Sequence, residues 1–508
     1  MQKEHPAVPY AIELNGLSKR FGQVQANNNI CLTVKRGEIL ALLGENGSGK
    51  TTLMNMLSGI YKPDSGQIFL HSKEVSIRSP REAIQLGVGM IHQHFKLVDV
   101  LTARENILLG EGGRKRGNLN DLCARFGLNI ELDKKIYDMS VGEKQTVEIL
   151  KVLARGADIL ILDEPTAVLT PQETEKLFDI LRRMRDDNKA IVIITHKLNE
   201  VMAISDRVTI LRRGESVDTV DTAHTHVQHL TELMVGRPVD LQIHRPEVEP
   251  GETLLDVHEV TVKSTEGAER LKSVTFSLQA GEILGVAGVA GSGQKELCEA
   301  IAGLQCIDVG QITLAGQRID GLTPRDIIQK GISMSFIPED RLGMGLVGGM
   351  NLTDNMLLKT YRDQKGMILS RKPARALAKR LIEKLKISTP GVNIAVKKLS
   401  GGNVQKVLLG REIDSNPKVL ITAYPVRGLD INSSHTIYDL INEQKQRGVG
   451  ILFIGEDLDV LLELSDRIMV MCGGRVTAIV PAMFATKELL GMKMTDALKA
   501  EKSEETYV

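Results

Sequence analysis

A glycine-rich segment between an apolar run and a helix-like run carries the clearest chemistry in this sequence. Residues 44–52 read Gly-Glu-Asn-Gly-Ser-Gly-Lys-Thr-Thr and match the pattern GxxxxGK(S/T), directly after the apolar residues 39–43. Because glycines have no Cβ, successive N–H groups of such a turn can point inward at a polyphosphate, and the following helix adds the positive end of its dipole. The sequence therefore predicts a nucleoside triphosphate site, with Lys50 at the β- and γ-phosphates and the Thr51 hydroxyl on Mg²⁺.

A second apolar run, residues 159–162, ends in the carboxylates Asp163 and Glu164. Asp163 suits a Mg²⁺ ligand that acts through water, and Glu164 suits the group that orients or deprotonates an attacking water. A solvated strand end is the alternative interpretation of these two acids. A further apolar run, residues 190–194, leads to His196 at the edge where open α/β sheets bind ligands, so we expect His196 to contact a γ-phosphate.

Phe21 lies upstream of the glycine-rich segment, in a region whose apolar–polar alternation from about residue 10 to 35 predicts the strands of a small sheet. An aromatic ring at this position could stack on adenine. A place in the hydrophobic core is the alternative for Phe21.

Composition excludes several classes of function. The 508 residues carry 64 Lys and Arg against 64 Asp and Glu, so no global basic field points to nucleic acid, and 3% aromatic content leaves little material for stacking bases. Five scattered cysteines without a CxxC pair fit reduced thiols and no metal site. The N-terminal residues contain no apolar core of a signal peptide, and no run of about 18 apolar residues exists, so we expect no direct membrane insertion.

A chain of this length exceeds one hydrophobic core, and its second half is an altered copy of the first. Residues 281–288 parallel residues 37–44 at an offset of 288 − 44 = 244. The copy has lost the chemistry of the first half: Gln294 stands for Lys50, Lys295 for Thr51, Ala423 for Asp163, Tyr424 for Glu164, Glu339 for Gln93 and Glu456 for His196. The second glycine-rich loop is therefore predicted not to hydrolyse nucleotide, although its amides can still hold one.

One feature is kept better in the second half than in the first. Residues 399–402 read Leu-Ser-Gly-Gly, whereas the first half has the altered Met-Ser-Val-Gly-Glu at residues 139–143. A Ser and a Gly at a helix N-terminus form an anion-binding end. The complementary losses indicate one working site, built from the first half's glycine-rich loop and the second half's Leu-Ser-Gly-Gly helix end.

The order of these motifs resembles that of ATP-binding-cassette (ABC) ATPases, and the likeness covers about residues 10–490. The doubled chain, with its degenerate second loop and Pro-Glu-Asp-Arg at 338–341, is similar to the ATPase subunits of bacterial sugar and nucleoside importers. The resemblance implies an α/β fold of two tandem P-loop NTPase domains. Each is expected to have a RecA-like core, an antiparallel β-subdomain and a helical subdomain that carries the signature.

The resemblance and the proline-bearing stretch after Gly236 together predict the domain limits. We expect a first ABC ATPase domain with intact motifs at residues 8–240, a linker at 241–252, and a second domain with degenerate motifs and an intact signature at 253–497.

Site residues carried over from the family motifs extend this prediction. The implied ATP contacts are Phe21, Gly44, Asn46, Gly47, Ser48, Gly49, Lys50, Thr51, Thr52, Ser400, Gly401 and Gly402. Catalytic roles are implied for Lys50, Gln93, Glu164 and His196, and Mg²⁺ ligation for Thr51, Gln93 and Asp163. Asp430 matches the D-loop acid of the family, where the first half has Thr170.

The same resemblance implies partners and a location. We expect the chain to work on the cytoplasmic face of the cell membrane with integral-membrane permease subunits, two of them, and through these with an extracytoplasmic solute-binding protein. Residues 92–102 look like those of nucleoside-importer ATPases, which favours a nucleoside over a ribose- or galactose-type sugar as the solute.

Other classes fit less well. A twin-cassette protein acting on ribosomes usually keeps both catalytic sites and has a long charged helical linker. A DNA-repair ATPase would need a long coiled coil, but only 163 − 50 = 113 residues separate Lys50 from Asp163. An exporter usually carries its own membrane spans, and a purely regulatory module would have lost the first site as well.

Overall fold

The structure is a computed structural model that describes residues 10–22, 24–92, 95–109, 119–167, 169–195, 197–238, 242–264, 266–289, 291–336, 345–361, 364, 369–427 and 429–495. It divides into two compact units, Met1–Asp240 and Leu241–Val508.

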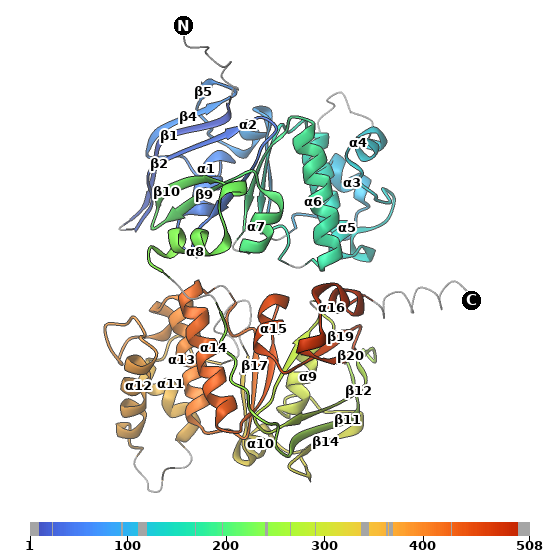
Figure 1. The fold of residues 1–508 in the computed structure, drawn as a ribbon, viewed down its shortest axis with the longest axis vertical. Helices are drawn as coiled ribbons and strands as arrows, with labels where there is room; N and C mark the ends of the chain where they lie inside the picture. The colour runs from blue at the N-terminus through green and yellow to red at the C-terminus, as the bar shows by residue number, and fades with distance from the viewer. Residues whose placement is uncertain are drawn as a thin grey trace, which may run out of the picture. The chain divides into compact units, whose positions relative to one another are not determined.

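Within its described residues, the first unit combines an antiparallel sheet of order β2-β1-β4-β5 with a larger sheet of order β10-β9-β3-β8-β7-β6 (Figure 1). Its elements are β1 (Tyr10–Phe21), β2 (Val24–Lys35), β3 (Ile39–Leu43), α1 (Lys50–Leu57), β4 (Ser65–Leu70), β5 (Lys73–Val75), α2 (Pro80–Gln85), β6 (Val88–Ile91), α3 (Ala103–Leu108), α4 (Leu119–Phe126), η1 (Ile136–Asp138), α5 (Val141–Ala154), β7 (Ile159–Asp163), α6 (Pro171–Asp186), β8 (Ala190–Ile194), α7 (Leu198–Ile204), β9 (Arg207–Arg212), β10 (Glu215–Asp221), η2 (Thr222–His224) and α8 (Val227–Val235).

The central strands of the larger sheet are apolar because both of their faces are covered. Every residue of β3 and β8 is buried, and β3 pairs in parallel with β8 and β9. The strand β7 lies on the other side of β8, also in parallel. The carboxyl ends of β3, β7 and β8 therefore meet at one edge of the sheet, where the sequence predicts the nucleotide site.

The second unit repeats this plan, with sheets of order β12-β11-β14-β15 and β16-β17-β18-β13-β19-β20 among its described residues. Its elements are β11 (Thr253–Lys263), β12 (Glu269–Gln279), β13 (Ile283–Ala287), α9 (Gln294–Ile301), β14 (Val309–Leu314), β15 (Gln317–Arg318), α10 (Pro324–Lys330), β16 (Ile332–Phe336), α11 (Leu352–Thr360), α12 (Lys372–Lys384), η3 (Val396–Lys398), α13 (Gly401–Asp414), β17 (Val419–Ala423), α14 (Ile431–Gln446), β18 (Gly450–Ile454), α15 (Leu458–Leu464), β19 (Arg467–Cys472), β20 (Arg475–Pro481), η4 (Ala482–Phe484) and α16 (Lys487–Lys493).

Each element of the first unit has a counterpart in the second, in the same chain order and with the same strand neighbours. The predicted fold class, two tandem P-loop NTPase domains of α/β type, is confirmed. The offset between the copies is 332 − 88 = 244 at the start of β6 and β16, and 423 − 163 = 260 at the end of β7 and β17. The second copy is therefore 16 residues longer between these points, a region that contains α11 and α12.

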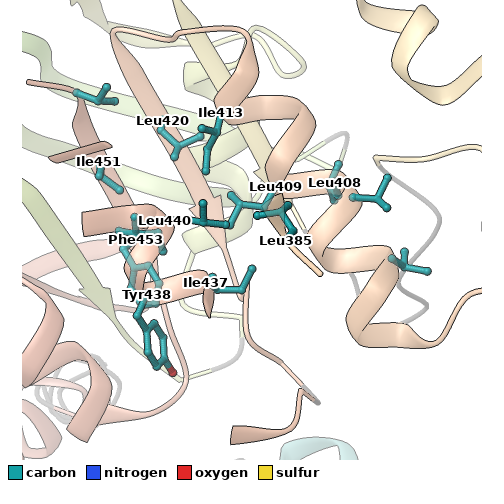
Figure 2. Packing of buried hydrophobic residues seen from close by; sticks show 14 of the residues in the cluster. Leu385, Leu408, Leu409, Ile413, Leu420, Ile437, Tyr438, Leu440, Ile451 and Phe453 are labelled. Atoms are coloured by element: carbon teal, nitrogen blue, oxygen red, sulfur yellow. The ribbon is translucent and has the colours of Figure 1, made fainter. Parts of the chain in front are cut away.

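The core of the second unit's helical layer positions its signature helix α13. Apolar side chains of α13 and α14 pack against those of β17 and β18 (Figure 2). The labelled members of this cluster are Leu385, Leu408, Leu409, Ile413, Leu420, Ile437, Tyr438, Leu440, Ile451 and Phe453. Because these side chains are buried, α13 is held against the strands that end at the degenerate site.

A fully buried carboxylate, Glu412 on α13, joins three elements of the second unit. Its oxygens accept hydrogen bonds from Ser333 Oγ on β16 (2.5 Å), Lys359 Nζ on α11 (2.6 Å) and Arg411 Nη2 (2.8 Å). Burial tends to raise the pKa of this carboxyl, but Arg411 and Lys359 outweigh burial and hold the pKa below its usual value. Glu412 is therefore charged at neutral pH inside the core.

In the first unit, the positions that match Ser333 and Glu412 are occupied by apolar residues. By the offsets above, Gly89 stands for Ser333 and Val152 stands for Glu412. A Cβ added to Gly89 would lie 2.0 Å from Val152 Cγ1, so these two residues are already in close contact. The ion cluster around Glu412 is thus a feature of the second copy and not of the shared fold.

The segment expected to link the domains packs against the second unit where the structure describes it. Asn442 Nδ2 donates a hydrogen bond to the His244 carbonyl (3.2 Å), and the Arg245 guanidinium donates to the Ser465 carbonyl. The Gly251 N–H donates to the Ala280 carbonyl (2.9 Å). Residues 242–251 therefore extend the second unit. None of the described helices combines the length and apolar character that a bilayer span requires.

Candidate active site

The glycine-rich loop between β3 and α1 has a backbone that only glycine can adopt at two positions. Gly44 has φ 155°, and an added Cβ would lie 2.3 Å from the Leu211 carbonyl oxygen. Gly49, the N-cap of α1, has φ 100°, and an added Cβ would lie 2.3 Å from the Ala26 carbonyl oxygen. The close packing of neighbouring strands thus explains why these positions lack side chains, and the loop keeps a surface of backbone amides.

Lys50 is buried inside this loop. Its Nζ donates hydrogen bonds to the Gly44 carbonyl (2.6 Å) and the Glu45 carbonyl (3.1 Å), and its residue is 7% exposed. Burial lowers the pKa of Lys50, whereas the charges of Glu164 and Asp163 act in the opposite direction. A buried ammonium group folded onto its own loop fits a site whose ligand carries several negative charges.

The other predicted loop residues differ in exposure. Asn46, Gly47 and Thr51 are exposed, and Thr52 is half-buried. The Ser48 hydroxyl is buried and has no hydrogen-bond partner among the described residues. This donor and the exposed amides are the groups that a polyphosphate would use.

Asp163 and Glu164 lie at the carboxyl end of β7. Burial, followed by the charge of Glu164, raises the pKa of Asp163 to about 6, although Lys50 opposes the shift. Glu164 has the left-handed φ of 47°, and its N–H donates to the Ile194 carbonyl at the end of β8 (2.8 Å). The two acids are therefore held by a defined turn, and the solvated strand end is the weaker interpretation for Asp163. A divalent cation beside these groups would relieve the repulsion between them.

Phe21 ends β1 on the surface of the first unit. Its residue is 43% exposed, so it is not a core residue. The ring lies edge-on to that of Tyr61, with centroids 5.1 Å apart, and Lys19 Nζ lies 5.6 Å from the Phe21 centroid. The side chain is therefore partly accessible to a stacking partner.

Replacing Phe21 with Ala should weaken ATP binding by roughly 5- to 150-fold, because base–aromatic stacking contributes roughly 1–3 kcal/mol. Isothermal titration of the full-length chain with ATP measures this change. A Phe21→Tyr variant should bind ATP normally, and Val24→Ala, another exposed position nearby, serves as the control. An unchanged dissociation constant in Phe21→Ala would contradict adenine stacking.

Gln93 and His196 lie outside the described residues, so their predicted roles stay predictions. Their neighbours are defined: burial, followed by Lys96, lowers the pKa of His92. The Thr195 hydroxyl accepts a hydrogen bond from the Lys197 N–H (3.1 Å) at the end of β8. Glu339 of the second unit also lies outside the described residues.

The second unit keeps the backbone of this site with other side chains. Gln294 is buried and donates from Nε2 to the Val289 carbonyl (3.3 Å), so it is folded onto its own loop as Lys50 is. Tyr424 has φ 54°, and its N–H donates to the Ile454 carbonyl (2.8 Å), matching the turn of Glu164. Burial, followed by the charge of Glu456, raises the pKa of Tyr424 to about 12, so this phenol is neutral and cannot act as a base at neutral pH.

Lys295 and Glu456 have taken structural partners. Lys295 Nζ lies 3.8 Å from Glu299, and Glu456 lies 3.3 Å from Arg427 Nε. Neither side chain supplies the hydroxyl or imidazole that the first unit has at the matching place.

The two signature helices differ at their N-termini. In the first unit, Ser140 and Glu143 form a capping box, and the Glu143 carboxylate also accepts from Lys134 Nζ (2.8 Å). In the second unit, Ser400 makes no capping bond to the helix, and its hydroxyl instead accepts from Asn403 Nδ2 (2.8 Å). The end of α5 thus carries its own carboxylate, whereas the end of α13 carries a neutral amide. The altered motif is visible in the sequence, whereas this role of Glu143 follows only from the structure.

Comparisons with known proteins identify the family of the chain. The family model described as "ABC transporter" matches residues 27–167 and 271–425. The nucleoside import ATP-binding protein NupA of Lactococcus lactis is 42% identical over 95% of this chain and 97% of its own length. The guanosine import ATP-binding protein NupO of Bacillus subtilis is 44% identical over 97% and 98%. The ribose import ATP-binding protein RbsA of Caldanaerobacter subterraneus is 38% identical over 95% and 98%.

Solved structures give the fold alone. An archaeal ribosome recycling factor, aABCE1, aligns over 92% of this chain and 90% of its own with a TM-score of 0.61 but only 18% identity. The family model accounts for both copies of the cassette, and the curated relatives span nearly the whole chain. This chain therefore belongs to the ABC transporter family, as an ATP-binding protein with two cassettes in tandem.

Proposed function

We propose that this chain is the ATP-hydrolysing subunit of an importer that moves a nucleoside through a separate membrane permease. The observation that carries the proposal is the asymmetry of the two units. Lys50, Asp163 and Glu164 form one charged group in the first, and Gln294, Ala423 and Tyr424 replace them in the second. Full-length relatives named for nucleoside and guanosine import support the choice of solute.

In the proposed mechanism, the first unit binds and cleaves ATP. Its loop amides and Lys50 hold the phosphates, Phe21 stacks on adenine, and Thr51, Gln93 and Asp163 hold Mg²⁺. The Mg²⁺ ion neutralises charge on the phosphate oxygens when it is bound. Glu164 orients the attacking water, and His196 contacts the γ-phosphate.

The second unit is proposed to contribute Ser400, Gly401 and Gly402 from the N-terminus of α13. An uncapped helix end with a neutral neighbour suits a phosphate better than the end of α5, which carries Glu143. Binding of the γ-phosphate by both units would favour a closed state, and hydrolysis would remove that bridge.

The proposed partners are two permease subunits and, through them, an extracytoplasmic solute-binding protein, with this chain on the cytoplasmic face of the membrane. The second candidate solute is a simple sugar of the ribose or galactose type. Relatives named for ribose import at 38% identity and glucose import at 40% identity favour that alternative less than the nucleoside relatives favour theirs.

Reconstitution with its permease tests the solute. We expect ATPase activity in proteoliposomes to rise when the solute-binding protein is loaded with guanosine, adenosine or uridine, and not when it is loaded with ribose, galactose or glucose. The Glu164→Gln chain in the same vesicles gives the background. Stimulation by a sugar with no response to nucleosides would reverse the assignment of solute while leaving the importer role intact.

A further inference from the structure

We propose that Arg427 is a positioning residue, which fastens the signature helix α13 to the ends of β17 and β18 so that Ser400–Gly402 keep one orientation. The inference rests on the proposed function, because Ser400–Gly402 matter only if they complete the ATP site of the first unit. In this proposal Tyr424 and Glu456, which replace Glu164 and His196 of the first unit, help to hold Arg427.

The first connection runs from α13 to the backbone of Arg427. Gln405 lies one turn after Ser400, and its residue is 1% exposed. Its Nε2 donates a hydrogen bond of 2.7 Å to the Arg427 carbonyl. An amide this deeply buried loses its solvation on folding, so the bond to Arg427 is what satisfies this donor.

The second connection runs from the side chain of Arg427 to the ends of both strands. Its Nε lies 3.3 Å from Glu456 Oε1, just after β18, and its Cζ lies 5.8 Å from the centroid of the Tyr424 ring, just after β17. The Arg427 N–H also donates to the Tyr424 carbonyl (3.1 Å). Arg427 therefore joins three segments that are distant in sequence.

The residues after Arg427 contact the signature itself. A Cβ added to Gly402 would lie 3.1 Å from Leu429 Cδ2, so Leu429 packs directly on the first turn of α13. Asp430 then caps α14, with its carboxylate accepting from the Ser433 N–H (2.8 Å). Holding Arg427 in place therefore also holds Leu429, which packs against Gly402.

The first unit lacks this arrangement. At the offset of 260, Ala167 stands for Arg427 and Gln145 stands for Gln405. Gln145 is buried as well, yet its Nε2 has no hydrogen-bond partner among the described residues. Among the described residues each glutamine leaves one amide atom unpaired, Nε2 in Gln145 and Oε1 in Gln405, and only Gln405 donates from Nε2 to the carbonyl at this position. Gln145 therefore serves as the comparison position in the other unit.

Steady-state ATPase assays of the full-length chain test the proposal. We expect Gln405→Ala and Arg427→Glu each to lower kcat roughly tenfold. Gln405→Ala leaves the Arg427 carbonyl unpaired, and Arg427→Glu replaces the ion pair with Glu456 by a repulsion between two carboxylates. ATP binding to the first unit, measured by titration, should change by less than about twofold, since Gln405 and Arg427 are not part of the glycine-rich loop. Gln145→Ala should keep kcat within about twofold of the wild type.

A charge exchange separates positioning from loss of folding. The double variant Arg427→Glu/Glu456→Arg should recover kcat to within about threefold of the wild type if the ion pair orients the segment. Equal losses in Gln145→Ala and Gln405→Ala, or normal kcat in Arg427→Glu, would overturn the inference. A charge exchange as inactive as Arg427→Glu alone would do the same.

The Glu164→Gln variant in the same assay keeps the two proposals distinguishable. If Glu164→Gln retains turnover, the proposed function has failed. If Glu164→Gln is inactive while Arg427→Glu is normal, only the positioning role of Arg427 has failed.

Discussion

Glu164→Gln should reduce ATP turnover by roughly 10²–10³-fold, whereas Tyr424→Gln at the matching position of the second unit should keep at least about a third of it. Glutamine has the size of glutamate but cannot accept a proton from the attacking water. The substitution should leave the turn unchanged, because the turn is held by a backbone hydrogen bond from the N–H of residue 164 to the Ile194 carbonyl. The Tyr424 ring contacts Arg427 and packs against the apolar core of the second unit, and it has no carboxylate that could act on a water. Phosphate release under saturating Mg²⁺ and ATP measures both rates.

Two results would contradict this single-site account. One is a comparable loss of turnover in Glu164→Gln and Tyr424→Gln. The other is hydrolysis that persists after Lys50→Ala, because cleavage would then have to occur in the second unit, at the loop that holds Gln294.

Glu412→Gln should lower the free energy of unfolding of the second unit by about 3–5 kcal/mol. The change removes a buried negative charge and leaves Arg411, whose side chain is 6% exposed, without its ionic partner. Lys359 loses the same partner. Urea denaturation, followed by a probe placed in the second unit, measures the shift.

Glu443→Gln is the matched control for this prediction. Glu443 pairs with Lys384 at 2.7 Å, but both side chains are more than 40% exposed, so removing the charge should change stability by less than about 1 kcal/mol. A loss of similar size in both variants would show that burial is not what makes Glu412 important. An unchanged midpoint in Glu412→Gln would show that the cluster is not charged.

Local patterns in the sequence were sufficient to predict the main architecture. The apolar runs at 39–43, 159–162 and 190–194 became β3, β7 and β8, because parallel strands covered on both faces need such runs. The duplication was visible from residues 37–44 and 281–288. The extra 16 residues of the second copy could not be inferred from that pair of segments, because the insertion lies further along the chain, between β16 and β17.

The site could be predicted wherever chemistry depends on residue type and spacing. The charges of Asp163 and Glu164 act on the pKa of Lys50, and the charge of Glu164 acts on the pKa of Asp163, as expected for a helix start and a strand end at the same edge of the sheet. Phe21 could not be assigned from position alone, because a ring at a strand end serves either as core or as surface. Its exposure decides against the core.

Contacts between residues that are distant in sequence could not be predicted from local patterns. Glu412 follows Arg411 in a helix, a pair that usually marks a solvated face, and nothing local indicates Ser333 or Lys359 as its partners. The contact between Gln405 and Arg427 spans 22 residues and depends on how α13 lies against β17. Such contacts follow from tertiary packing and not from a motif.

Glu164 and Tyr424, at matching positions of the two units, have the same left-handed backbone. Both residues have a similar steric strain, with φ of 47° and 54°, although only Glu164 has a carboxylate that the turn could orient. The positive φ at this strand end is thus a property of the duplicated fold. A positive φ alone does not indicate a catalytic residue here. The second unit, which we propose to be inactive in hydrolysis, keeps the left-handed turn of the first.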